Sequence, residues 1–146
     1  MQNRNHKRVL LADISTVDDP RSFSVRIAEE LCDKGEFRFV EQEKQCFFEA
    51  ESSVRSLDRI LLGIERASVY SNEFEGLIAI DVSELESCAG ESYVESFMRK
   101  LEKHNDRAVF LFFANPNGRI ANVLSSHFAD IETNQEMLLT GGIHNA

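Results

Sequence analysis

Three polar residues follow short apolar segments of this sequence, and their types suit chemistry on phosphates. Asp13 follows Val9-Leu10-Leu11-Ala12, Asp81 follows Leu77-Ile78-Ala79-Ile80, and Asn115 follows a run of seven apolar residues. If these segments are parallel strands, the three residues converge at the carboxyl edge of one sheet, where α/β proteins bind ligands. Carboxylate oxygens are the hard ligands that Mg²⁺ prefers. Asp13 and Asp81 are therefore candidate metal ligands, either in a magnesium-dependent phosphate-chemistry enzyme or in a nucleotide-binding domain.

The same three residues also have purely structural explanations. The carboxylates of Asp13 and Asp81 can accept hydrogen bonds from the loops that follow their strands. Asn115 precedes Pro116, and asparagine at such a position is a natural turn former. Both interpretations remain open on the sequence alone.

Histidine and cysteine show no pattern typical of catalysis or of a metal site. No pair of the four histidines has metal-ligand spacing, and no serine lies in a G-x-S-x-G motif. The three cysteines, Cys32, Cys46 and Cys88, are widely separated, without Cys-x-x-Cys. Such scattered thiols are typical of a reducing compartment and argue against a zinc site.

The segment Ala108–Ala114 is the clearest indication of the fold. It consists of seven apolar residues, three of them Phe, and it ends at the breakers Asn115-Pro116-Asn117-Gly118. A strand with one wet face would alternate polar and apolar residues, whereas this one needs cover on both faces. Seven residues between breakers is short for a helix, so we predict a strand near the centre of a mostly parallel sheet.

The remaining pattern alternates strands with helices, which predicts an α/β fold: a three-layer α/β/α sandwich around a five-stranded sheet. Further strands are expected at Arg8–Ala12, Phe37–Phe39, Leu77–Ile80 and Ala129–Glu132. Amphipathic helices are expected from Asp19-Pro20 to Lys34-Gly35, from Ser52 or Ser53 through Ser68, from Tyr93 to Leu101, and over Arg119–Ser126. The segment Glu41–Glu51 is interpreted as irregular or as a short helix, and Met137–Leu139 as a short helix or strand.

Composition limits the domain organisation and the partners. We expect residues 1–7 to be a flexible arm, residues 8–139 a single α/β domain, and residues 140–146 a flexible C-terminus. No apolar run approaches the roughly 20 residues of a membrane span, and no signal-peptide core is present, so a soluble, cytoplasmic protein is expected. The net charge of −9 repels phosphate backbones, which argues against a nucleic-acid partner.

Two segments resemble motifs of one enzyme family. Ile78-Ala79-Ile80-Asp81-Val82-Ser83-Glu84 resembles a Walker B segment, in which apolar residues lead to acidic ones. The strand Val109–Ala114 followed by Asn115 resembles the sensor strand, whose last polar residue faces the γ-phosphate. Over residues 8–132 the order of elements is similar to the nucleotide-binding core of AAA+ ATPases, within the P-loop NTPases. The resemblance implies strand order 5-1-4-3-2, ATP and Mg²⁺ as cofactors, and, if nucleotide binding is retained, a site formed by Arg21, Ser22, Asp81, Glu84 and Asn115.

The phosphate-binding loop of that family is missing. It should read G-x-x-x-x-G-K-[ST] between the first strand and the first helix. The corresponding interval, Asp13–Ser22, contains no Gly and no Lys, and it carries three Asp. Carboxylates this close to a triphosphate are strongly unfavourable without an intervening cation. The sequence also offers no match to the lid domain that follows the core in this family.

We therefore expect a non-catalytic protein-interaction module derived from an AAA+-like core, with ATP binding and hydrolysis lost. Its expected partner is a protein, either a second copy of the chain or another ATPase-like subunit. One alternative is the magnesium-dependent enzyme or nucleotide-binding domain that uses Asp13 and Asp81. Another is an active ATPase whose phosphate loop comes from a neighbouring chain.

Overall fold

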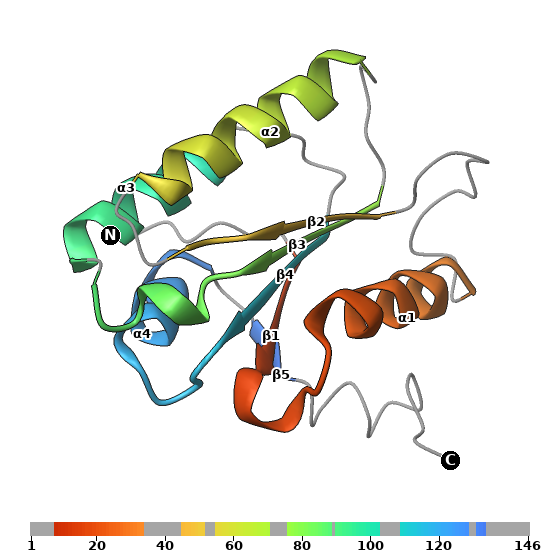
Figure 1. The fold of residues 1–146 in the computed structure, drawn as a ribbon, viewed down its shortest axis with the longest axis horizontal. Coiled ribbons are helices and arrows are strands. Elements are labelled where there is room, and N and C mark those ends of the chain that lie inside the picture. Colours follow the sequence, from red (N-terminus) through yellow and green to blue (C-terminus); the bar gives the residue numbers. More distant parts are fainter. Residues whose placement is uncertain are drawn as a thin grey trace.

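The protein is built on one five-stranded parallel sheet (Figure 1). The computed structural model describes residues 8–33, 45–51, 55–70, 76–88, 90–102, 109–128 and 131–133. The strands are β1 (Val9–Asp13), β2 (Gln45–Glu49), β3 (Leu77–Asp81), β4 (Val109–Ala114) and β5 (Ile131–Thr133). Their order across the sheet is β2-β3-β4-β1-β5, and every pairing is parallel. The predicted order 5-1-4-3-2, which is the same order counted from the other edge, is confirmed.

Strand β4 lies at the centre of the sheet, as the unbroken apolar run predicts. All six of its residues are buried, and it is paired with β1 on one side and β3 on the other. Alternate side chains of β4 enter two separate cores: Phe110 and Phe112 on one face, Leu111 and Phe113 on the other. A polar residue inside this strand would therefore have to enter one of the cores.

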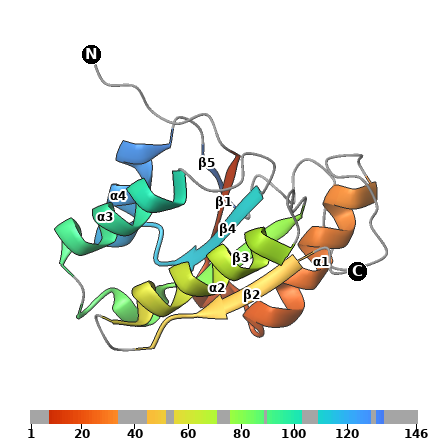
Figure 2. The ribbon, with the colours of Figure 1, turned by 90° about the horizontal axis from the view of Figure 1, so that it is seen from above.

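The helices cover the two faces unequally (Figure 2). The core of one face contains side chains from α2 (Ser56–Tyr70), α3 (Glu91–Glu102) and α4 (Arg119–His127). The core of the other face contains Ile27, Ala28 and Leu31 of α1 (Pro20–Asp33), the α-helix that covers this face within the described part of the chain. The predicted three-layer α/β/α arrangement is confirmed.

The second strand differs from the prediction. Strand β2 occupies Gln45–Glu49, so the interpretation of Glu41–Glu51 as irregular or as a short helix is wrong. The apolar part of this strand is three residues long, Cys46 to Phe48, and acidic residues on both sides obscure it in the sequence. Parallel pairing with β3, which is a non-local interaction, sets its conformation.

Several expectations fall outside the described residues. These are the strand at Phe37–Phe39, the element at Met137–Leu139, and the arm and tail at residues 1–7 and 140–146. The other predicted helices and strands are present, with ends within a few residues of those expected. None of the helices that the structure describes is both long enough and apolar enough to cross a membrane.

Candidate functional site

The connections that follow β1 and β4 cross opposite faces of the sheet, and open α/β sheets usually bind ligands at the point where this reversal occurs. The connection that leaves β1 leads to α1 on one face, and the connection that leaves the neighbouring β4 leads to α4 on the other face. Ligands of such folds bind outside the carboxyl ends of the strands at this switch point. Asp13 pairs with Ala114 there, and Asp81 of β3 pairs with Phe113. The three strand ends with polar residues therefore lie together, as predicted.

Asp13 and Asp81 both turn back onto their own loops. Asp13 Oδ1 accepts hydrogen bonds from the Ser15 backbone N–H at 3.0 Å and from the Ser15 hydroxyl at 2.7 Å. Asp81 Oδ1 accepts the same pair from Ser83, at 3.0 and 2.7 Å. Each aspartate precedes a short 3₁₀ helix, η1 (Ile14–Thr16) or η2 (Ser83–Leu85). The two strands therefore end in the same Asp-x-Ser turn, an arrangement that Asp readily forms.

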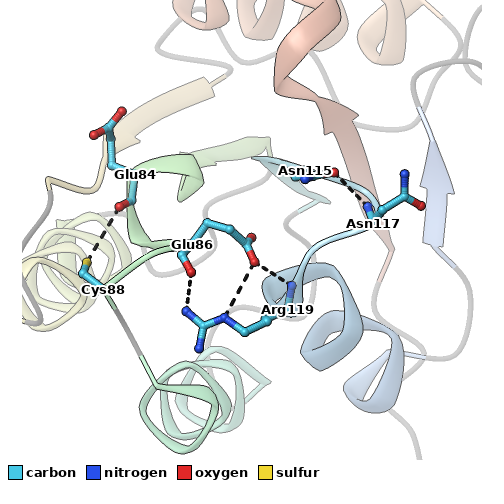
Figure 3. Close-up of polar contacts among 6 residues, drawn as sticks. All are labelled: Glu84, Glu86, Cys88, Asn115, Asn117 and Arg119. Atoms are coloured by element: carbon cyan, nitrogen blue, oxygen red, sulfur yellow. Dashed lines mark hydrogen bonds and ion pairs between the residues drawn. The ribbon is translucent and has the colours of Figure 1, made fainter.

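Asn115 closes a third turn of this kind. Its Oδ1 accepts a hydrogen bond from the Asn117 backbone N–H at 3.0 Å (Figure 3). Its carbonyl accepts one from the Gly118 N–H at 2.9 Å. The side chain is exposed, but its acceptor oxygen points along its own loop. The turn expected from Asn115-Pro116 is therefore present.

The interval between β1 and α1 has none of the features of a phosphate cradle. Its first part is the helical turn η1, and Ile14 and Val17 pack against the core on the α1 face. A phosphate cradle needs several backbone N–H groups that curl around one anion. Here the Ser15 N–H is already bonded to Asp13, and the Val17 N–H is bonded to the Ile14 carbonyl.

The N-terminus of α1 is capped by a carboxylate of the chain. Asp19 Oδ1 accepts a hydrogen bond from the Arg21 backbone N–H at 3.2 Å, and its Oδ2 accepts one from the Ser22 hydroxyl at 2.7 Å. These bonds, that of the Ser22 hydroxyl first, hold the pKa of the exposed Asp19 below its usual value. Pro20, the first residue of α1, has no N–H to offer. This helix terminus therefore presents a negative charge where an anion would otherwise bind.

Arg21 is engaged with an aromatic cluster. Its guanidinium lies over the Phe47 ring of β2, 4.6 Å from the ring centroid. The Phe47 and Phe23 rings both meet the buried Phe113 ring edge-on, with centroids 6.1 and 5.9 Å away. Arg21, the cation that the sequence suggested for a phosphate, thus helps to hold the start of α1 against the sheet.

The N-terminus of α4 is also closed by a carboxylate, one that the sequence did not indicate. Glu86 Oε2 accepts a hydrogen bond from the Arg119 backbone N–H at 2.6 Å, and the Glu86 carbonyl accepts one from the Arg119 guanidinium (Figure 3). The carboxylate lies directly against Gly118, where a Cβ atom would be 2.6 Å from its Cδ and both oxygens. Its Oε1 is buried and has no hydrogen-bond partner among the described residues. The absence of a side chain at Gly118 therefore permits this close approach.

No protein-family model matches this sequence, and a search of curated proteins finds no significant match.

Glu84, the second acidic residue of the segment that resembles Walker B, is not part of this arrangement. Its side chain is exposed and points away from Glu86 and Arg119 (Figure 3). Its carbonyl accepts a weak hydrogen bond from the Cys88 thiol at 3.7 Å. In the part of the chain that the structure describes, no three His, Cys, Asp or Glu residues gather as a metal site.

The site therefore consists of three strand-end turns and two capped helix termini. Sequence reasoning located Asp13, Asp81 and Asn115 at one edge, and it placed the start of α1 at Asp19. It missed Glu86, Gly118 and Arg119. Because Glu86 and Arg119 are 33 positions apart, no local pattern could have revealed their contact.

Proposed function

We propose that this chain is a non-catalytic protein-interaction module, built on an AAA+-like core that neither binds nor hydrolyses ATP. One observation carries the proposal: carboxylates of the chain itself cap the helix termini that follow β1 and β4. Asp19 caps α1 and Glu86 caps α4, on the two sides of the switch point. These are the positions where backbone N–H groups would otherwise attract phosphates.

The electrostatic consequence is substantial. A phosphate placed beside one of these carboxylates is repelled by a charge of the same sign, most strongly where water is excluded. Water screens the exposed Asp19, but Asp13, Asp18 and Asp81 add charge of the same sign along the same edge. Arg21, in the first turn of α1, lies over the Phe47 ring. With this edge unsuited to phosphates, the proposed activity resides in the surface of the scaffold, which binds a protein such as a second copy of the chain or an ATPase-like subunit.

Thermal unfolding followed by circular dichroism tests the first half of the proposal. The full chain is heated alone, with millimolar Mg²⁺, and with millimolar ATP and Mg²⁺. A ligand at 100 times its dissociation constant stabilises the folded state by about 2.7 kcal/mol, so even weak specific binding would raise the melting temperature. We expect no rise. A rise with ATP and Mg²⁺ that disappears in Asp81→Asn, which keeps the turn-forming acceptor, would overturn the proposal.

The arm with Mg²⁺ alone addresses the alternative, an enzyme that uses Asp13 and Asp81 as metal ligands. These residues lie on the two strands that flank β4, but Asp13 is in register with Ala114 and Asp81 with Phe113, so their side chains leave opposite faces of the sheet and a shared cation would require one of them to turn. A rise in melting temperature with Mg²⁺ that is lost in both Asp13→Asn and Asp81→Asn would favour that enzyme. Light scattering during size-exclusion chromatography over a hundredfold concentration range then tests whether the partner is a second copy.

A further inference from the structure

We draw no further inference here: the strongest candidate, the N-terminus of α4 where Gly118 and Arg119 face the Glu86 carboxylate, belongs to the site already described, and nothing among the described residues points to a ligand that would replace that carboxylate.

Discussion

Glu86 and Arg119 are joined through both backbone and side chain, although 33 positions separate them. The Glu86 carboxylate accepts the Arg119 backbone N–H, and the Arg119 guanidinium donates to the Glu86 carbonyl. Glu86 belongs to the connection between β3 and α3, whereas Arg119 is the first residue of α4. Gly118 itself offers no side-chain cap, so Glu86 supplies from a distance the acceptor that an N-cap residue usually provides.

Replacing Glu86 with alanine should destabilise the fold, because the first N–H of α4 loses its acceptor and the helix dipole loses a compensating charge. Loss of a helix cap typically costs about 1–2 kcal/mol. The measurement is urea unfolding followed by far-UV circular dichroism, since the chain contains no Trp. Hydrogen exchange of the Arg119 amide should accelerate in the same variant.

A matched control for this variant is Glu95→Ala. Glu95 pairs with Arg99 four residues later on the exposed side of α3, so it is also a glutamate bonded to an arginine. Such surface pairs contribute at most about 0.5 kcal/mol. If both variants lose the same small amount of stability, the capping role of Glu86 is wrong.

Asp19 should make the stability of the fold depend on acid pH. Its pKa in the folded state lies below the usual 3.8, so its contribution is complete above that value and is lost as the pH falls through the folded pKa. We expect the urea midpoint of the native chain to fall more steeply than that of Asp19→Asn between about pH 5 and pH 2. Equal slopes for the native chain and for Asp19→Asn would contradict the prediction.

Tyr93 should make the stability of the fold fall as the pH rises into the alkaline range, whereas Asp19 makes it fall as the pH drops. Burial, and to a lesser extent the charge of Asp58, raises the pKa of Tyr93 above its usual 10.0. The unfolded chain therefore loses this proton first, and stability falls as the pH rises from 10 through the folded pKa. Tyr93→Phe should reduce the loss of urea midpoint between about pH 9 and pH 11 relative to the native chain.

The same Tyr93→Phe variant should be no less stable than the native chain at pH 7. The Tyr93 hydroxyl is buried and makes no hydrogen bond of normal geometry among the described residues, and the Asp58 backbone is only a weak partner, so removing the hydroxyl leaves no strongly bonded group newly unpaired. A clear loss of stability at pH 7 in Tyr93→Phe would contradict the expectation and would reveal a strong hydrogen bond of the Tyr93 hydroxyl.

Gly63 in α2 should resist substitution for a steric reason. A Cβ atom there would lie 2.6 Å from a ring carbon of Phe48 in β2. Alanine gains about 1 kcal/mol of helix propensity over glycine. We nevertheless expect Gly63→Ala to lower the free energy of unfolding by about 1–2 kcal/mol, because the ring has to move.

A double-mutant cycle isolates this contact. In a Phe48→Leu background the smaller side chain should accept the new methyl group, and Gly63→Ala should become neutral or stabilising. Gly90→Ala, where a Cβ atom would meet nothing within 4 Å, is the steric control. If Gly63→Ala costs the same with Leu as with Phe at position 48, the proposed clash is not its cause.

The sequence predicted those parts of the fold whose signal is local. The apolar run of β4 needs cover on both faces, so its central position followed from seven consecutive residues. The regular spacing of apolar residues predicted α2 and α3 within a few residues. Strand β2 was missed because its apolar part is too short to stand out, and its pairing partner Leu77–Asp81 lies about 30 residues away in the chain.

The candidate site also combines features that a local sequence pattern predicts with contacts that depend on the tertiary structure. An Asp followed two residues later by Ser is a local turn pattern, so the turns at Asp13 and Asp81 could be anticipated from sequence. The contact of Arg21 with Phe47 and that of Glu86 with Arg119 depend on which elements become neighbours in space. Those neighbours are known only once the sheet order is known.

The position of β1 has a consequence for how the chain acquires its structure during synthesis. Of the strands that the structure describes, β1 is translated first, yet its neighbours in the sheet are β4 and β5, the last two of these strands. Val9 pairs with Phe110, so roughly one hundred residues must be translated after β1 before its partner β4 is available. Until then Val9–Ala12 remains an exposed hydrophobic segment without a strand partner, which chaperones are expected to bind. Fragments truncated before β4 should therefore aggregate rather than fold.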